Sequence, residues 1–282
     1  MAKSLKIVSD NCCDLPPEIL RKYDIKQINM LVRFGDREIK PGEMNNDEFY
    51  RNMASSPVLP QTSQPVVEEI IRVYSSLLEE KDTEVIGIHM SSGLSGTVQS
   101  VQMVQEMLQQ PRLHIIDSLK ASMGLGLMVL EAARLADKGA GASTILSRLE
   151  EMKSSVRCIF SVQNLEYLIS GGRISKGKGL IAGVLNIKPI LCIDDTGFII
   201  PYDKARGHRA ALKKVLDIMG ELGSNLNGQT VGISHAAALD DAIYLKENME
   251  ERFGVKEVVI GEIGPVIGSH VGPGTFSIFF ES

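Results

Sequence analysis

The sequence has no tryptophan, few other aromatic residues and no excess of positive charge. Its 282 residues include 0 Trp, 6 Tyr and 8 Phe, so aromatic platforms that stack on nucleic-acid bases have little material. Lys and Arg number 30 against 35 Asp and Glu, which gives a formal net charge of −5. A nucleic-acid binder needs a basic face to neutralise phosphates. We therefore expect no nucleic-acid partner.

Cysteine and long apolar runs are equally scarce. The 4 cysteines form no CxxC pair and no zinc-like spacing with histidine, so we expect neither a bound metal nor another resident cofactor. Unpaired thiols favour a cytoplasmic location. No apolar run reaches the roughly 18 residues of a membrane span, and the first residues lead into a strand-like run instead of a signal peptide. We expect a cytoplasmic protein without an integral membrane segment.

What the sequence does have is a hydrophobic content of 44% and a regular succession of apolar and amphipathic segments. The length suggests one large or two ordinary domains. In the first half, apolar runs alternate with helical patterns, which predicts a parallel sheet covered on both faces. The second half mixes hairpin signatures with helices. We predict an α/β plus α+β protein: a three-layer α/β/α domain with a parallel sheet over 1–160 and an α+β domain with a mixed sheet over 161–282.

Residues 91–97, here called the serine loop, lie between an expected strand and an expected helix. Unpaired backbone N–H groups and the helix dipole make a helix start attractive to anions. Gly93 lets the backbone approach a ligand, and Ser92 and Ser95 add hydroxyl donors. The alternative is an ordinary helix cap with spare serines.

A second hydroxyl-rich segment, residues 62–65, also precedes a helical pattern. Ser63 is expected to cap that helix, which leaves Thr62 free to point at a ligand. Loops at the carboxyl ends of neighbouring parallel strands converge where ligands bind in open sheets. We therefore expect the two segments to meet. Asp14 is expected to cap the helix that follows the first strand.

Near the C-terminus, residues 264–274 form a glycine-rich loop that contains His270. A histidine can hydrogen-bond a carboxylate or a hydroxyl near neutral pH, although a buried structural histidine is the alternative. A serine hydrolase using Ser95 is a further alternative, because Ser95 sits at a strand-to-helix turn as a nucleophile elbow does. The G-x-S-x-G pattern fails at Thr97, and no partner histidine or acid is singled out. A small-anion-binding protein is also kept open.

Five motifs, taken in order, resemble those of the DegV family and span essentially the whole chain. They are Thr62-Ser63-Gln64-Pro65; residues 91–97; Leu165-Glu166-Tyr167-Leu168 with Gly171-Gly172-Arg173-Ile174-Ser175; Lys188-Pro189-Ile190-Leu191; and Gly264-Pro265-Val266-Ile267-Gly268 with His270 and Gly272-Pro273-Gly274. The resemblance implies a bacterial lipid-binding protein that is not itself an enzyme. It implies binding of a long-chain fatty acid, whose carboxylate is presented to an ATP-dependent fatty acid kinase and phosphorylated to an acyl phosphate, in phospholipid synthesis.

The resemblance also implies roles for particular residues. The carboxylate-binding set is Thr62, Ser95, Ser92, Ser63, Gly93 and His270. The implied acyl chain needs a dry ligand tunnel, which we expect at the interface of the two domains. Its candidate walls are chosen for their apolar character, with ordinary core residues as the alternative; they are Ile181, Val184, Leu185, Ile190, Ile267 and Phe280. Each buried methylene contributes about 0.8 kcal/mol, so a long chain supplies most of the affinity. Arg173 and Arg206 are expected to contact the kinase or the transferring phosphate, although the neighbours of Arg206 depart from the family's usual valine-arginine-threonine.

Overall fold

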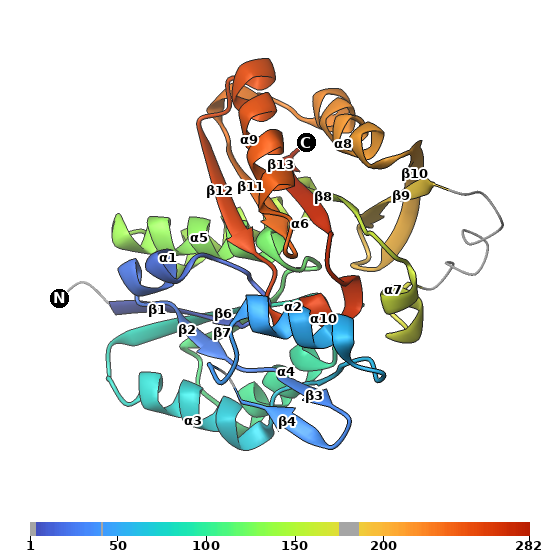
Figure 1. Ribbon diagram of the computed structural model, residues 1–282. Coiled ribbons are helices and arrows are strands. Elements are labelled where there is room, and N and C mark those ends of the chain that lie inside the picture. The colour runs from blue at the N-terminus through green and yellow to red at the C-terminus, as the bar shows by residue number, and fades with distance from the viewer. Residues whose placement is uncertain (1–3, 41, 175–185) are drawn as a thin grey trace.

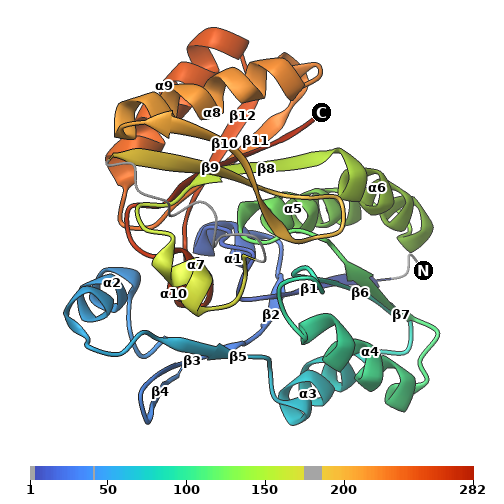
Figure 2. The same ribbon diagram turned by 90° about the vertical axis from the view of Figure 1, so that its right-hand side faces the viewer.

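The computed structural model describes residues 4–40, 42–174 and 186–282. Two main sheets are stacked, with helices between them and on both outer sides (Figures 1 and 2). None of the helices in these residues is both long and apolar enough to cross a membrane. The four cysteines form no disulfide bond.

The first sheet is parallel and has the strand order β2-β1-β6-β7. Its strands are β1 (Ser4–Asp10), β2 (Lys26–Ile28), β6 (Thr83–His89) and β7 (Leu113–Asp117). The helices α3 (Val67–Leu78) and α4 (Thr97–Leu108) cover one face, and α5 (Met123–Asp137) covers the other (Figure 2). Burial on both faces explains the nearly continuous apolar strands. The predicted three-layer α/β/α arrangement is confirmed.

The second sheet is mixed and has the order β10-β9-β8-β13-β11-β12. Only β11 and β12 of these pair in parallel; the other neighbours are antiparallel. Its strands are β8 (Val156–Ser161), β9 (Ile187–Ile193), β10 (Ile199–Arg206), β11 (Thr230–His235), β12 (Glu257–Glu262) and β13 (Phe276–Glu281). This sheet confirms the predicted mixed α+β character. The predicted boundary between residues 160 and 161 falls inside β8 and remains a prediction.

Helices lie on both faces of the mixed sheet. The outer face is covered by α8 (His208–Leu222) and α9 (Leu239–Phe253), whereas α5 and α6 (Ala142–Ser155) contact the inner face. Since α5 touches β1 and β6 on one side and β8, β11 and β13 on the other, it belongs to the core of both sheets. The space between the sheets is therefore built from both halves of the chain.

A small third sheet and several short helices complete one side of the molecule. The sheet is antiparallel, with the order β4-β3-β5, and its strands are β3 (Leu31–Phe34), β4 (Arg37–Ile39) and β5 (Gln61–Ser63). The short elements are α1 (Pro17–Lys22), α2 (Asn46–Ser55), α7 (Glu166–Ser170), the 3-10 turn Leu226–Gly228 and α10 (Pro265–Val271). Because α10 connects β12 to β13 in the chain and contacts β3 and β5, it joins the third sheet to the mixed sheet.

Candidate functional site

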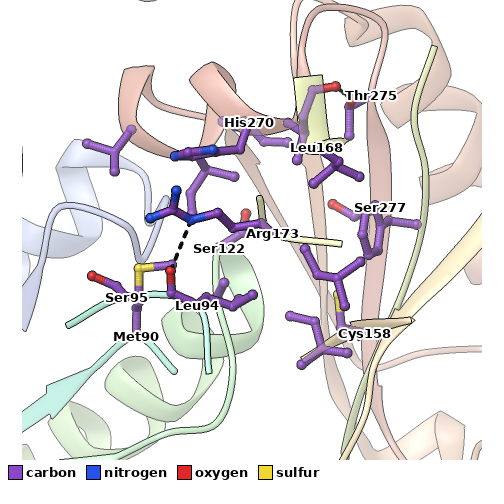
Figure 3. A pocket seen from close by; sticks show the side chains of 18 of the residues that line it. Met90, Leu94, Ser95, Ser122, Cys158, Leu168, Arg173, His270, Thr275 and Ser277 are labelled. Atoms are coloured by element: carbon purple, nitrogen blue, oxygen red, sulfur yellow. Dashed lines mark hydrogen bonds between the residues drawn. The ribbon is translucent and has the colours of Figure 1, made fainter. Parts of the chain in front are cut away.

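An apolar cavity lies between the serine loop, α10, α7 and the inner face of the mixed sheet. Its empty volume is about 650 Å³, a figure that includes space open to solvent. Polar side chains gather on one side, where Figure 3 shows Ser95, Arg173 and His270, while Cys158 and Ser277 lie on the opposite side. The cavity therefore has a polar end and a mostly apolar remainder.

Thr62 and His270 form a direct contact at the polar end. Thr62 Oγ1 lies 2.7 Å from His270 Nε2. Burial, together with the nearby positive charge of Arg173, lowers the pKa of His270 to about 4. The imidazole is therefore neutral at neutral pH, and one of its nitrogens carries the proton. When the ring N–H donates to Thr62 Oγ1, the hydroxyl proton of Thr62 is free to be donated to a group in the cavity.

The other ring nitrogen of His270, Nδ1, is buried and has no hydrogen-bond partner among the residues that the structure describes. It faces Gly171, where an added Cβ would lie 2.3 Å from Nδ1. The absence of a side chain at Gly171 is therefore a condition for this orientation of the ring. The sequence shows a glycine pair after α7, but only the structure shows that Gly171 allows this close approach of His270.

Ser95 and Arg173 approach the same end of the cavity from different elements. Ser95 Oγ is 2.8 Å from Thr97 Oγ1 and accepts a hydrogen bond of 3.3 Å from Thr97 N, at the start of α4. Arg173 Nε donates to Leu94 O at 3.2 Å, a contact drawn in Figure 3. Burial lowers the pKa of Arg173, yet an arginine keeps its charge in proteins. Arg173 is thus a cation beside hydroxyl donors.

A second, more polar groove meets the cavity at this end. It shares Thr62, Arg173 and His270 with the cavity and is also lined by Tyr167 and Ser170. A group bound at the polar end therefore faces a path that does not run through the apolar part.

The structure brings Thr62 to the site by a different route from the one expected. Residues 62–65 are not a helix start: Thr62 lies in β5, and α3 begins later at Val67, without a side-chain cap. In β5, Gln61 and Ser63 are exposed while Thr62 is half-buried, as the alternation of a strand requires. The expectation that Ser63 caps a helix is wrong, and Ser63 does not line the cavity.

Two residues of the serine loop shape the loop without lining the cavity. The backbone N–H of Ser92 donates to Asp117 Oδ1 at 3.2 Å. Gly93 lies against the turn between β9 and β10, where an added Cβ would be 2.8 Å from Gly197 O. The same turn accepts a 2.8 Å hydrogen bond from Ser91 Oγ at Gly197 O. These contacts dock the hairpin of the second half on the loop of the first.

The structure places the expected tunnel walls in different parts of the protein. Ile267 lines the cavity, but Ile190 and Phe280 lie on the opposite face of the mixed sheet, in the core beneath α8 and α9. Their neighbours Ile193 and Phe279 line the cavity instead. Both faces of this sheet are covered and both carry apolar residues, so the sequence pattern did not reveal which residues face the cavity and which face the outer helices. The remaining expected walls, Ile181, Val184 and Leu185, lie outside the described residues.

Asp14 does not cap α1, contrary to expectation. The residue before α1 is Pro16, and that helix has no side-chain cap. The carboxylate of Asp14 instead accepts hydrogen bonds from Ser122 Oγ at 2.6 Å and from Gly264 N at 2.9 Å. Burial raises the pKa of Asp14 to about 7, although both hydrogen bonds oppose the rise. Sequence reasoning missed Ser122, which lines the cavity.

Other proposed chemistries find less support in the site. Ser95 is paired with Thr97, and His270 with Thr62, so neither contact forms a serine–histidine pair. Among the described residues, no group of three His, Cys, Asp or Glu side chains is placed to hold a metal ion. Arg206 is exposed in β10 and is not among the residues that line the cavity.

The chain is similar to proteins and structures of one family over almost its whole length. A family model described as "Uncharacterised protein, DegV family" matches residues 4–282. A DegV domain-containing protein from Caldanaerobacter subterraneus subsp. tengcongensis is 31% identical over 280 residues, which cover 99% of each chain. The solved structure of a fatty-acid-binding DegV family protein from Thermus thermophilus has a TM-score of 0.92 and 29% identity, and the match covers 99% of this chain and 100% of that one. The fatty-acid-binding DegV of Bacillus subtilis has a TM-score of 0.87 and 29% identity, with 99% of each chain covered.

Proposed function

Since the chain belongs to the DegV family, we propose that it binds a long-chain fatty acid and presents the carboxylate to a partner kinase. The observation that carries the proposal is the polar end of the apolar cavity, where Thr62, Ser95, Arg173 and His270 converge. Structural neighbours in the family bind fatty acids. In this proposal the chain is a carrier, and the kinase supplies ATP and catalysis.

The carboxylate is held by hydroxyl donors and one guanidinium group. When Nε2 of His270 carries the ring proton, it donates to Thr62 Oγ1, and the Thr62 hydroxyl proton is free for the ligand. In the opposite tautomer Nε2 accepts the hydroxyl proton of Thr62, which is then not available to the ligand. A carboxylate therefore selects the first tautomer. Ser95 supplies a second hydroxyl and Arg173 the opposite charge, and charge-assisted hydrogen bonds are the stronger kind.

The acyl chain occupies the apolar part of the cavity. Ile193, Ile199, Phe279 and Ile267 form part of its wall, and Ile193 and Phe279 stand in place of the expected Ile190 and Phe280. Each Å² of apolar surface that is buried contributes roughly 25 cal/mol to the binding free energy, so each added methylene is favourable until the cavity is filled. Affinity should therefore rise with chain length and then stop rising.

The polar groove beside Thr62, Arg173 and His270 is the side from which a phosphoryl donor reaches the carboxylate. Arginine suits phosphoryl oxygens because its planar guanidinium forms paired hydrogen bonds with them. Arg173 is placed to contact both groups, and exposed Arg206 is retained as a contact with the kinase. The product would be an acyl phosphate for phospholipid synthesis in a bacterial cytoplasm.

The direct test compares ligands that differ only at the head. Delipidated protein is titrated calorimetrically with palmitate, palmitoleate and methyl palmitate. The acids should bind, whereas the ester, which has no negative charge, should bind at least tenfold more weakly. Equal binding of acid and ester would refute the placement of the carboxylate.

The kinase step and the hydrolase alternative need separate assays. With a purified ATP-dependent fatty acid kinase subunit, the loaded protein should support acyl phosphate formation, and Arg173→Gln should reduce it. A chromogenic ester turned over by the protein alone, and no longer by Ser95→Ala, would establish the hydrolase instead.

A further inference from the structure

Asp14 connects two walls of the apolar cavity that belong to distant parts of the chain. One carboxylate oxygen, Oδ2, accepts from Ser122 Oγ at 2.6 Å, just before α5 begins. The other, Oδ1, accepts from Gly264 N at 2.9 Å, just before α10 begins. Ser122 lines the cavity directly, and α10 contributes Val266, Ile267 and His270 to its wall.

Neither helix has a cap from its own side chains. Gly264 and Ser122 occupy the cap positions of α10 and α5, and neither makes a side-chain cap hydrogen bond there. The first N–H groups of a helix need acceptors from elsewhere. For α10, Asp14 supplies an acceptor to the N–H of Gly264, although the two residues are 250 positions apart in the sequence. The orientation of α10, and with it that of His270, therefore depends on a residue of the first β–α loop.

The backbone at both ends of the Asp14–Ser122 hydrogen bond adopts a sparsely populated conformation. The φ angles are +48° at Asp14 and +53° at Ser122. Non-glycine residues in this region cost on the order of 1 kcal/mol each and persist only where the surroundings enforce them. A further tight contact lies beside them, since a Cβ at Gly261 would be 2.0 Å from Asp14 O. This junction is held in one geometry.

We propose that Asp14 is a positioning residue of the fatty-acid site, which fixes the separation of the α5 and α10 walls and thereby the placement of His270. The inference rests on the proposed function, because it concerns the cavity that holds the ligand. Asp14 does not line that cavity and acts through Ser122 and Gly264.

The protonation of Asp14 offers a readout that a merely structural residue would lack. Its pKa is raised to about 7, chiefly by burial. Above that pH the carboxylate accepts from both Ser122 and Gly264. Below it, the protonated oxygen must donate to Ser122 Oγ, which turns its own proton to Ser234 Oγ, 2.9 Å away. A charge-assisted hydrogen bond is thereby replaced by a weaker neutral one.

Titratable groups face Asp14 from its own loop and from three other elements. They are Asp10 on β1, Cys12 and Cys13 on its own loop, Tyr50 on α2 and Glu262 on β12. Burial raises the pKa of both thiols and of the phenol, so these three stay neutral near pH 7. The charges of Asp10 and Glu262 both favour protonation of Asp14.

Asp14 also has a path to solvent that avoids the ligand. A second, more polar cavity is lined by Asp14, Glu18 and Glu262; of the residues in the described ranges, it shares only Met30 and Val266 with the apolar cavity. Protons can therefore exchange with Asp14 while the apolar cavity is occupied.

The test measures palmitate affinity from pH 6 to pH 8 for the wild type, Asp14→Asn, Asp14→Ala and the control Glu18→Gln. The wild type should bind about fivefold more weakly at pH 6 than at pH 8, as expected when one charge-assisted hydrogen bond becomes neutral. Asp14→Asn keeps an acceptor for Gly264 N and a donor for Ser122 but carries no charge, as protonated Asp14 does, so it should bind about as the wild type does at pH 6 and lose this pH dependence. Asp14→Ala should bind at least tenfold more weakly, and Glu18→Gln should match the wild type.

Each contrary result identifies what has failed. If the wild type does not bind palmitate at all, the proposed function fails. If the wild type binds and Asp14→Ala equals it, or Asp14→Asn is as weak as Asp14→Ala, or Asp14→Asn keeps the pH dependence, the positioning role is overturned. Should Asp14→Ala not fold, Ser122→Ala replaces it, because it removes the same bond from the other side; wild-type affinity and pH dependence in Ser122→Ala would overturn the role equally.

Discussion

Thr62 and His270 are 208 residues apart in the sequence, and their side chains meet at 2.7 Å between Oγ1 and Nε2. This contact joins the small third sheet to α10 and places a hydroxyl and a neutral imidazole at one end of an apolar cavity. Neither residue belongs to the parallel sheet that the sequence makes most evident. The polar end of the site is thus a product of tertiary structure.

Thr62→Val tests the threonine hydroxyl with little change in volume. The substitution should weaken palmitate binding by about 1–3 kcal/mol, because a charged carboxylate loses a donor and His270 loses its partner. Ser63→Ala is the matched control, since the neighbouring Ser63 is exposed and does not line the cavity. Calorimetry of both variants checks this, and equal affinities would refute the role of Thr62.

Gly171→Ala tests the orientation of His270. The added Cβ would lie 2.3 Å from Nδ1, so the ring must shift and its 2.7 Å contact with Thr62 must change. We expect palmitate affinity to fall by at least tenfold while the secondary structure, followed by circular dichroism, stays intact. Gly141→Ala is the control, because its Cβ would meet no atom within 4 Å. If Gly171→Ala bound palmitate normally, the ring orientation described here would not be the functional one.

His270 should make stability depend on pH in a defined window. Its folded pKa is lowered from 6.5 to about 4, so the unfolded chain binds the proton first as pH falls. The free energy of unfolding should therefore drop as pH goes from about 6.5 to 4, by roughly 3 kcal/mol at most, and level off below. In His270→Gln this part of the pH dependence should vanish. Denaturant titrations of both proteins at several pH values measure it; identical pH profiles would contradict a neutral buried imidazole.

Ser277→Phe tests the occupied part of the cavity. Ser277 is buried and lines the side away from the polar end (Figure 3), so a phenyl ring there takes space from the acyl chain. The variant should lose affinity for palmitate while still binding a shorter acid such as decanoate, and Ser277→Ala should retain both. A chain-length series read by competition would show this shift. Unchanged binding of every length would place the acyl chain elsewhere.

The order of elements and the family resemblance could be predicted from the sequence because they depend on local patterns. Apolar runs alternating with amphipathic segments predicted the parallel sheet and its covering helices, as found. Thr62, Ser95 and His270 were chosen together by motif, and the structure places all three along one cavity.

What could not be predicted depends on partners that are distant in the sequence. Asp14 looked like a local helix cap, but one of its partners is Gly264, 250 residues away. The faces of β13 were indistinguishable because Phe279 and Phe280 are both buried, one beside the cavity and one beneath the outer helices. Thr62 was assigned to a helix start because the pairing of β5 with β3 leaves no local signal.

The most direct measurement of the central claim is the mass of what the protein carries. Protein purified without detergent is examined by native mass spectrometry and, after organic extraction, by lipid mass spectrometry. We expect one fatty acid per chain in the wild type and a clearly smaller bound fraction in Thr62→Val. Well-folded protein that carries no fatty acid, and takes up none when palmitate is added, would contradict the account.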